Sequence, residues 1–344
     1  MTTVQPSIAS SVSILFKSQL GFSAKHPPKT TDLTGKVVIV TGGNTGLGFE
    51  SARQFLGFKA STVIIASRSD AKGKEAVAKL KSEFPKARVE AWPLDMLSYD
   101  SIQEFVKTVQ RELSRLDIVV LNAGLRKIGF GLSELTGHEE VVQVNYISTV
   151  LLSVLLLPIL KERSPSGTPG RLTIVSSGIV LLHKFPNSDR MPFLKSFNDV
   201  ATAPAPGLPN YAASKAMGHM FAAKIVEYVS SDDVIINLAD PGMTRGTEFL
   251  REFPRAALIL MAPLLRVITR SVRDGASTYL DATLVKGPES HGRFVMDWEV
   301  RPYADFLYTE AGKATTEKLW AETMDEFQGY NLRGLLDSMK KPAP

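Results

Sequence analysis

The stretch Val37–Gly48 reads VVIVTGGNTGLG, an apolar run that passes directly into a glycine-rich turn. Its β-branched residues predict a buried strand at Val37–Thr41, and helical periodicity follows over Leu47–Gly57. Glycines between a strand and a helix let the backbone approach a pyrophosphate, which the first N–H groups of the helix hold. Flanking by a strand and a helix favours this interpretation over a turn kept for packing alone. The residues expected to bind a dinucleotide here are Gly42, Asn44, Thr45, Gly46, Leu47 and Gly48.

The alternation of short apolar runs and longer helical patterns continues along the chain. Further strands are expected at Thr62–Ser67, Val89–Pro93, Ile118–Leu121, Leu172–Ser176, Ile235–Ala239 and Phe294–Met296. Helices are expected at Ala71–Phe84, Ser98–Leu113, Glu134–Leu160, Tyr211–Val229 and Val272–Leu284. Continuous apolar strands separated by helices imply a parallel sheet covered on both faces. The predicted fold is α/β, a single doubly wound, Rossmann-like domain with a parallel sheet of about seven strands.

Three segments depart from this rhythm. Residues 1–34 are polar and contain proline, and they predict an N-terminal arm before a nucleotide-binding domain at 35–296. Residues 297–344 form a C-terminal extension with a helix expected at Glu310–Phe327. Within the domain, residues 178–210 are a proline-rich insert over the active site, and residues 245–270 are expected to form a substrate lid.

The composition excludes several classes of protein. The 344 residues are 44% hydrophobic and 22% charged, with a net charge of +5 and no cysteine. No block of basic residues marks a nucleic-acid partner, and no metal is expected. The apolar runs Ile147–Leu160 and Ala256–Ile268 are shorter than the ~20 residues that span a bilayer, so we expect no membrane span. Peripheral membrane contact through Thr247–Ile268 is the alternative to a lid, and the absence of a secretory signal predicts a cytoplasmic protein.

The end of the second predicted strand bears on the choice of dinucleotide. Ser67 and Arg68 stand where a carboxylate would bind the ribose hydroxyls of NAD. A guanidinium binds phosphate in a bidentate fork, so Arg68 favours the 2′-phosphate of NADP(H). The alternatives are that Arg68 is a solvated loop charge, or that Asp70 serves NAD.

Tyr211 and Lys215 begin the predicted helix Tyr211–Val229. A spacing of four residues places them on one helical face, about 6 Å apart. The phenol and the ammonium can therefore act together in proton transfer.

With these motifs in order, the chain resembles the short-chain dehydrogenase/reductase family over residues 36–296. The length of the insert between Ser177 and Tyr211 is similar to the retinol-dehydrogenase-like branch, and both extensions resemble those of filamentous-fungal members. The resemblance implies that Asp95 holds the adenine and that Asn122-Ala123-Gly124 lines the cofactor. It assigns catalysis to Asn145, Ser177, Tyr211 and Lys215, with Ser176 as the alternative serine, and contact with the nicotinamide amide to Thr244, with Thr247 as the alternative.

Each expected catalytic residue has a chemical reason. Hydride transfer to a carbonyl builds negative charge on oxygen, which Tyr211 as proton donor and Ser177 as second hydrogen-bond donor would meet. The positive charge of Lys215 would lower the pKa of the Tyr211 phenol. Lys215 would also bind the nicotinamide ribose, and Asn145 would hold a water that relays protons.

The predicted function is an NADP(H)-dependent oxidoreductase that reduces a ketone or aldehyde of a lipophilic small molecule, such as a secondary-metabolite intermediate. The alternatives are an alcohol-oxidising dehydrogenase of retinol-like or steroid-like substrates and a non-catalytic NADP-binding sensor. Residues Leu181, Leu182, Phe185, Phe193 and Phe197 predict either a lipophilic substrate wall or packing of the insert onto the body. The helices Glu134–Leu160 and Tyr211–Val229 either form a homodimer or are covered by the terminal extensions.

Overall fold

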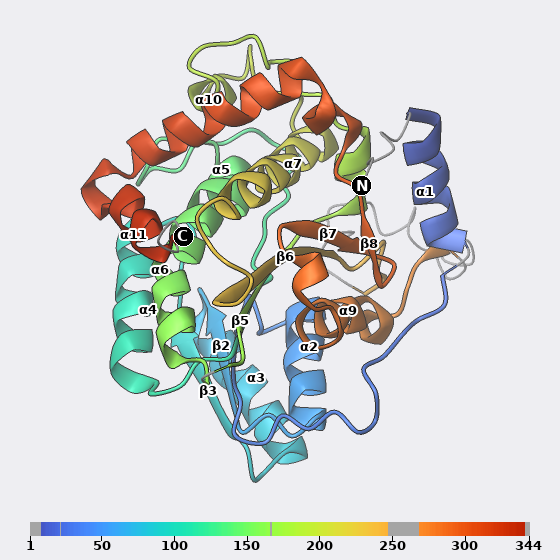
Figure 1. The fold of residues 1–344 in the computed structure, drawn as a ribbon, viewed down its shortest axis with the longest axis vertical. Coiled ribbons are helices and arrows are strands. Elements are labelled where there is room, and N and C mark those ends of the chain that lie inside the picture. The colour runs from blue at the N-terminus through green and yellow to red at the C-terminus, as the bar shows by residue number, and fades with distance from the viewer. Residues whose placement is uncertain (1–7, 21, 166, 247–267, 341–344) are drawn as a thin grey trace.

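The computed structural model describes residues 8–20, 22–165, 167–246 and 268–340. Its core is an eight-stranded sheet in the order β3-β2-β1-β4-β5-β6-β7-β8 (Figure 1). Seven strands run parallel, and β8 pairs antiparallel with β7. The strands are β1 (Val37–Thr41), β2 (Thr62–Ser67), β3 (Arg88–Pro93), β4 (Ile118–Leu121), β5 (Gly170–Val175), β6 (Val234–Asp240), β7 (Arg293–Met296) and β8 (Glu299–Arg301). The doubly wound prediction is confirmed, with eight strands in place of about seven.

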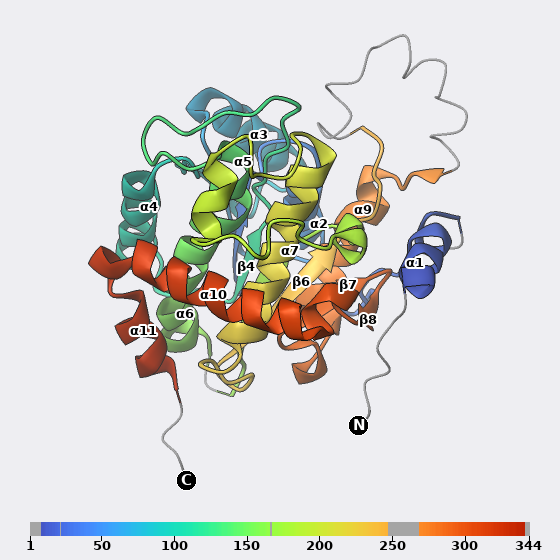
Figure 2. The ribbon, with the colours of Figure 1, turned by 90° about the horizontal axis from the view of Figure 1, so that it is seen from above.

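Helices cover both faces of this sheet (Figures 1 and 2). Helices α2 (Gly46–Gly57), α3 (Asp70–Glu83) and α9 (Val272–Leu280) bury their apolar residues in one core cluster. The cluster on the opposite face contains residues of α4 (Tyr99–Glu112), α6 (Ser148–Arg163), α7 (Leu208–Ile225), α10 (Glu310–Glu326) and α11 (Leu332–Met339). The central strands β1, β2, β4 and β6 are buried along their whole length, which is why their sequences are predominantly apolar, with Asn237 and Asp240 of β6 as buried polar exceptions.

The predicted helix Glu134–Leu160 begins later than expected. Residues 134–139 contain no helix, and the helical run comprises α5 (Glu140–Val142), a π-helical turn at Gln143–Ile147, and α6. This run, Glu140–Arg163, is the one helix among the described residues that is long and apolar enough to cross a membrane, and 89% of its apolar window is buried inside the fold. Its apolar surface therefore has a partner in the protein core.

The C-terminal extension packs onto α6 and α7, which belong to the two helices predicted either to form a homodimer or to be covered by the extensions. Helix α10 lies against α7 and α11 lies against α6, and Trp320 of α10 stacks on Tyr228 with 5.3 Å between ring centroids. Figure 2 shows α10 running across this face of the molecule. Within a single chain, the C-terminal extension therefore covers part of α6 and α7.

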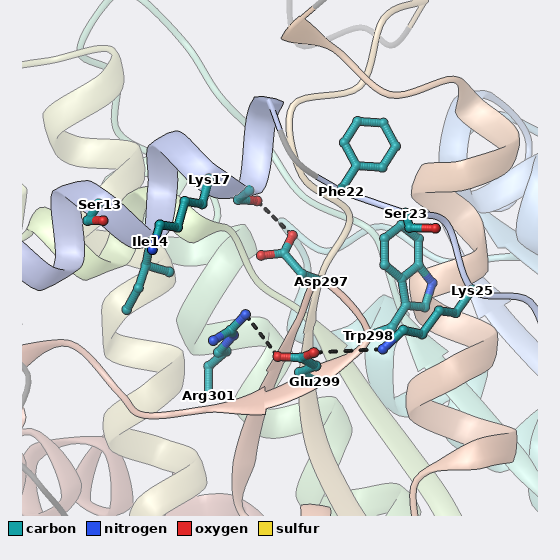
Figure 3. Close-up of a pocket in the computed structure, with 11 residues that line it drawn as sticks. Ser13, Ile14, Lys17, Phe22, Ser23, Lys25, Asp297, Trp298, Glu299 and Arg301 are labelled. Carbon is teal, nitrogen blue, oxygen red and sulfur yellow. Dashed lines mark hydrogen bonds and ion pairs between the residues drawn. The ribbon is translucent and has the colours of Figure 1, made fainter.

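Two elements lie in segments where neither a helix nor a strand was predicted. The N-terminal arm contains a helix, α1 (Ile8–Leu20), and the C-terminal extension opens with β8. Asp297 and Trp298 form the two-residue turn between β7 and β8 with positive φ at both positions (55° and 57°), the conformation that matches hairpin twist. Helix α1 docks at this turn, where the Ser18 hydroxyl donates to Asp297 Oδ1 over 2.7 Å (Figure 3).

Candidate active site

The glycine-rich turn lies at the carboxyl end of β1 and is tightly constrained. Gly42 and Gly46 have positive φ (63° and 55°), a conformation that favours glycine. A Cβ at Gly48 would lie 2.4 Å from the Gly42 carbonyl oxygen, so only glycine fits there. The Asn122 side chain donates to the Thr41 carbonyl over 2.9 Å and so ties the end of β4 to this turn.

This turn has room and polarity for a phosphate group. Nothing lies within 4 Å of an ideal Cβ on Gly46, and Thr45 at the N-cap of α2 makes no side-chain capping hydrogen bond. The first turn of α2 also contains no acidic residue. Free N–H groups at the positive end of a twelve-residue helix fit the pyrophosphate of a dinucleotide. Asn44 is half-buried in the turn, and Leu47 lines the adjoining cavity.

The predicted adenosine-side residues lie at the ends of β2 and β3. Arg68 is exposed immediately after β2, while Ser67 is buried and donates to the Ser69 carbonyl over 3.1 Å. Asp70 is paired with Lys74 at 2.6 Å on the exposed face of α3. Asp95 is half-buried, and its Oδ1 accepts from the Leu97 N–H over 3.0 Å.

Tyr211, Lys215 and Ser177 meet beside one cavity at the carboxyl ends of β5 and β6. The side-chain hydroxyls of Tyr211 and Ser177 are hydrogen-bonded to each other. The Lys215 Nζ lies 6.0 Å from the centroid of the Tyr211 ring and donates to the Val175 carbonyl over 2.7 Å. Tyr211 and Lys215 come from α7, and Ser177 follows the end of β5. The four-residue spacing places Tyr211 and Lys215 on one face of α7, as predicted.

Burial dominates the electrostatics of this group. It raises the pKa of the Tyr211 phenol, and the nearby Asp240 carboxylate raises this pKa further. The Ser177 hydrogen bond and the positive charge of Arg126 act in the opposite direction. Burial also lowers the pKa of the Lys215 ammonium to about 8. The positive charge that acts on Tyr211 here comes from Arg126, whereas the sequence pointed to Lys215.

The two serines at the end of β5 face different partners. The Ser176 hydroxyl lies 2.8 Å from Nε2 of His219, a buried imidazole whose pKa burial lowers to about 3. Ser177 faces Tyr211 instead. The geometry therefore favours Ser177 as the serine that acts with the phenol.

Asn145 lies in the π-helical turn and holds the loop after β4. Its Oδ1 accepts from the Leu125 N–H over 2.7 Å, while its Nδ2 donates to the Leu125 carbonyl and to Ser214 Oγ over 2.8 and 2.9 Å. An ideal Cβ on Gly124 would lie 3.2 Å from Asn145 Oδ1 and 3.3 Å from Lys215 Nζ. Asn145 is therefore next to the Lys215 group, with its amide engaged in positioning the loop.

Thr244 is buried just beyond Pro241-Gly242, and its hydroxyl lies 3.1 Å from the Gly242 carbonyl oxygen, to which it donates. Its backbone pairs with Arg270 in a short parallel bridge. The alternative, Thr247, lies outside the described residues, as do most of the expected lid and of the segment proposed for membrane contact.

The insert phenylalanines do not form a substrate wall. Phe185, Phe193 and Phe197 are at most 1% exposed and pack on one another and on Phe306, with ring centroids 5.4–5.7 Å apart. Their apolar character serves to fix the insert onto the body. The substrate-wall interpretation of these residues is wrong, and the packing alternative is correct.

The cavity beside Tyr211 has a volume of about 450 Å³ and a mixed lining. Its apolar walls come largely from residues that the sequence did not single out, namely Leu15, Ile179, Leu208 and Met243. Polar residues that were also missed are Gln19, Arg126 and Tyr279. Asp240 lines the cavity too, and it begins the segment Asp240–Thr244, for which the family resemblance implies contact with the nicotinamide amide. Leu15 and Gln19 could not be found from the sequence, since they reach the site from an arm distant in sequence.

A parallel sheet with a phosphate-binding turn and a hydroxyl pair at its carboxyl edge defines a nucleotide-dependent enzyme of the Rossmann class. The profile of the short chain dehydrogenase family matches residues 36–186. The chain is 50% identical over 327 residues to the short chain dehydrogenase/reductase mfmJ of Annulohypoxylon moriforme, with 94% of each chain covered. It is 40% identical to the short chain dehydrogenase virL of Hypocrea virens, with 92% of each covered. This chain belongs to the short-chain dehydrogenase/reductase family.

Solved structures share the fold at lower identity. The NADPH-bound short chain oxidoreductase from Pseudomonas aeruginosa PAO1 aligns with a TM-score of 0.59 and 20% identity, covering 76% of this chain and 95% of that one. The likeness agrees with the architecture described above.

Proposed function

We propose that this protein is an NADP(H)-dependent oxidoreductase that reduces a ketone or aldehyde of a lipophilic small molecule, with Tyr211 as proton donor. The hydrogen-bonded hydroxyls of Tyr211 and Ser177, beside a cavity with apolar walls, are the observation that carries the proposal. The fungal relatives are in line with a secondary-metabolite intermediate as substrate, whereas a cytoplasmic location stays a prediction. The retinol-dehydrogenase-like branch and a homodimer stay predictions.

NADP(H) is the cofactor that the residues at the end of β2 favour. Arg68 is exposed where a 2′-phosphate would lie, and Asp70 is already paired with Lys74. The turn at Gly42–Gly48 would hold the pyrophosphate, and Asp95 would lie at the adenine. Asn122 and Thr244 line the same cavity as Tyr211 and would lie along the nicotinamide end.

The side chains of this site suit the protonation of a developing alkoxide. When bound, NADPH supplies the hydride that reduces the carbonyl carbon. The Tyr211 phenol is protonated at neutral pH, because the ordinary pKa of tyrosine is about 10 and burial raises it further, so the hydroxyl is available as a donor. The Ser177 hydroxyl and the charge of Arg126 stabilise the phenolate that forms. Lys215, with a pKa of about 8, is mostly protonated at neutral pH and adds positive charge one helical turn away.

The decisive experiment compares wild type with Tyr211→Phe on a panel of apolar aldehydes and ketones. We expect NADPH consumption to fall by about 10²–10⁴-fold in the variant, because the general acid is lost. Fluorescence titration should show unchanged NADPH binding. Tyr330→Phe is the matched control, since that ring keeps its edge contacts with Tyr99 and Phe327 far from the cavity lining.

Two results would contradict the proposal. Turnover that survives in Tyr211→Phe would remove Tyr211 from the proton-donor role. Tight NADPH binding without Tyr211-dependent turnover on any carbonyl would favour the non-catalytic sensor.

A further inference from the structure

Asp240 is a buried carboxyl that faces the catalytic cavity from the carboxyl end of β6. Its side chain is 2% exposed, and its Oδ2 atom has no hydrogen-bond partner. Asp240 also acts on Tyr211, because its negative charge raises the pKa of the phenol. Such a carboxyl oxygen is costly to bury unless a ligand satisfies it.

The protein groups around Asp240 do not satisfy this oxygen. The backbone N–H groups of Gly242 and Gly178 lower the pKa of the carboxyl, yet its Oδ2 atom has no hydrogen-bond partner among the described residues. Arg270 is the cation that acts on Asp240, but its guanidinium is bonded to Asp297, to Ser18 and to the Pro241 carbonyl. Asp240 therefore has no ion pair of its own.

The position of Oδ2 is set by Gly178, the residue that follows Ser177. An ideal Cβ on Gly178 would lie 3.2 Å from Asp240 Oδ2 and 3.0 Å from Leu15 Cδ2. The oxygen thus lies where the Ser177 strand end meets α1. Leu15 of α1 and Ile179, which follows Gly178, line the same cavity.

Helix α1 brings a second acceptor to the same cavity. Gln19 lines it, and the Oε1 atom of this side chain is buried without a hydrogen-bond partner. Its Nε2 reaches the Ser18 hydroxyl over 3.4 Å. Two acceptor oxygens from residues far apart in sequence, Gln19 and Asp240, therefore line this cavity beside apolar residues.

We propose that Asp240, assisted by Gln19, binds a hydroxyl group of the substrate and is a specificity-determining residue of this enzyme. The substrate class is then an apolar carbonyl compound that carries a hydroxyl group away from its reducible carbonyl. This assignment rests on the proposed reductase function and adds the recognition group to it.

A hydroxyl is the ligand group that the charges of the cavity favour. It donates to a carboxylate or to an amide oxygen, and it accepts from a protonated carboxyl, so it suits Asp240 in either state. A cationic ligand is disfavoured by Lys215 and Arg126, which line the same cavity. An anionic group is disfavoured by Asp240 itself.

The test compares hydroxybenzaldehydes and hydroxynaphthaldehydes with their methyl ethers, which lack the donor. In wild type we expect kcat/KM for at least one hydroxy compound to exceed that for its ether by about tenfold or more. In Asp240→Asn, which offers one acceptor oxygen in place of two, this ratio should fall towards one. Gly178→Ala, which places a methyl group near Oδ2, should lower the ratio as well. Asp281→Asn is the control, because Asp281 is also buried but does not line the cavity.

Two binding measurements separate the outcomes. Calorimetry with hydroxybenzyl alcohols and their ethers reports recognition without turnover, and an NADPH titration reports the cofactor side. A wild type that binds both partners of each pair equally, or an Asp240→Asn variant that keeps the preference, overturns the proposal. So does weakened NADPH binding in Asp240→Asn with the preference intact, which would assign Asp240 to the cofactor. Selective binding with no turnover of any carbonyl supports hydroxyl recognition and overturns the reductase function instead.

Discussion

The two sides of the active site are built in different ways. The cofactor side consists of β1, the turn at Gly42–Gly48 and α2, which are continuous in sequence and are held by hydrogen bonds from the Asn122 side chain to the Thr41 and Gly42 carbonyls. The substrate side gathers α1, the start of the insert at Gly178 and the end of β6 from positions far apart in the chain. Ser18 and Asp297, whose contact docks α1, are separated by 279 positions.

This difference shows which part of a site a local motif can specify. A turn whose geometry depends on neighbouring residues leaves a signature in the sequence. A wall that depends on long-range docking leaves none. The two sides should therefore also fail in different ways when single residues are changed.

The largest effect is expected at Gly48, on the cofactor side. Gly48→Ala forces a methyl group to within 2.4 Å of a backbone carbonyl, so we expect a loss of about 3 kcal/mol in stability together with NADPH binding. Gly57→Ala in the same helix meets nothing within 4 Å and should be neutral or stabilising. Urea unfolding and NADPH titration of both variants check this. Wild-type stability and NADPH binding in Gly48→Ala would show that the turn can adjust to a side chain at this position.

On the substrate side, Asp297→Asn should lower stability by about 3 kcal/mol without the loss of NADPH binding, because it leaves the fully buried Arg270 without its carboxylate. Asparagine tolerates the positive φ of this turn, so the change isolates the charge. Glu299→Gln is the control, since its pairs with Lys25 and Arg301 lie at the surface and should be worth under about 1 kcal/mol (Figure 3). Thermal unfolding gives the stabilities, and equal losses in both variants would contradict the distinction.

Lys215 lines the cavity between the two sides. Its contribution to the free energy of unfolding should depend on pH. Burial lowers its pKa from 10.5 to about 8, so between these values the unfolded chain binds more protons and stability rises with pH. Below about pH 8 the full penalty of about 3 kcal/mol applies. Lys215→Met should therefore raise the free energy of unfolding at neutral pH. The gain is reduced by the loss of the hydrogen bond to the Val175 carbonyl. The same variant should lack activity.

The check is a pair of urea titrations of wild type and Lys215→Met over this pH range. Their stability difference should shrink as pH rises towards 10.5, and other titrating groups cancel in the comparison. A difference independent of pH would mean that Lys215 is not desolvated.

A smaller effect is expected at Arg68, where a substitution should change the binding of NADPH but not of NADH. Arg68→Ala should weaken NADPH binding by about 10–100-fold and leave NADH binding nearly unchanged, because a charge-assisted bond to the 2′-phosphate is lost. Lys81→Ala, an exposed cation in the last turn of the neighbouring α3, serves as control. Equal weakening for both dinucleotides would place Arg68 outside the phosphate site.

The strands were the most predictable part of the molecule. Strands β1, β2 and β4 begin and end at the predicted residues, because a central parallel strand is buried on both faces and must be apolar throughout. Strand β8 has three residues, two of them charged, and pairs only because the Asp297–Trp298 turn reverses the chain. Its sequence shows no alternation that would indicate a strand.

Within the site, spacing placed Tyr211 and Lys215 correctly on one helical turn, whereas aromatic content misplaced the substrate wall. The insert phenylalanines and the cavity residues Leu15 and Leu208 are all apolar, so hydropathy alone could not distinguish them. What separates them is tertiary packing, which buries Phe193 and Phe197 completely and leaves Leu208 43% exposed.

The contact of α1 with the β7–β8 turn also sets an order of assembly on the ribosome. The guanidinium carbon of Arg270 lies 4.8 Å from the Phe22 ring centroid and 4.9 Å from that of Trp298, and the two rings lie 6.2 Å apart. Ser18 of α1 thus depends on Asp297, which lies 279 positions further along the chain. Domains fold as units while the chain emerges, so the cofactor side can form before α1 meets the β7–β8 turn. The substrate side is therefore completed only after the turn at Asp297 and Trp298 has been synthesised.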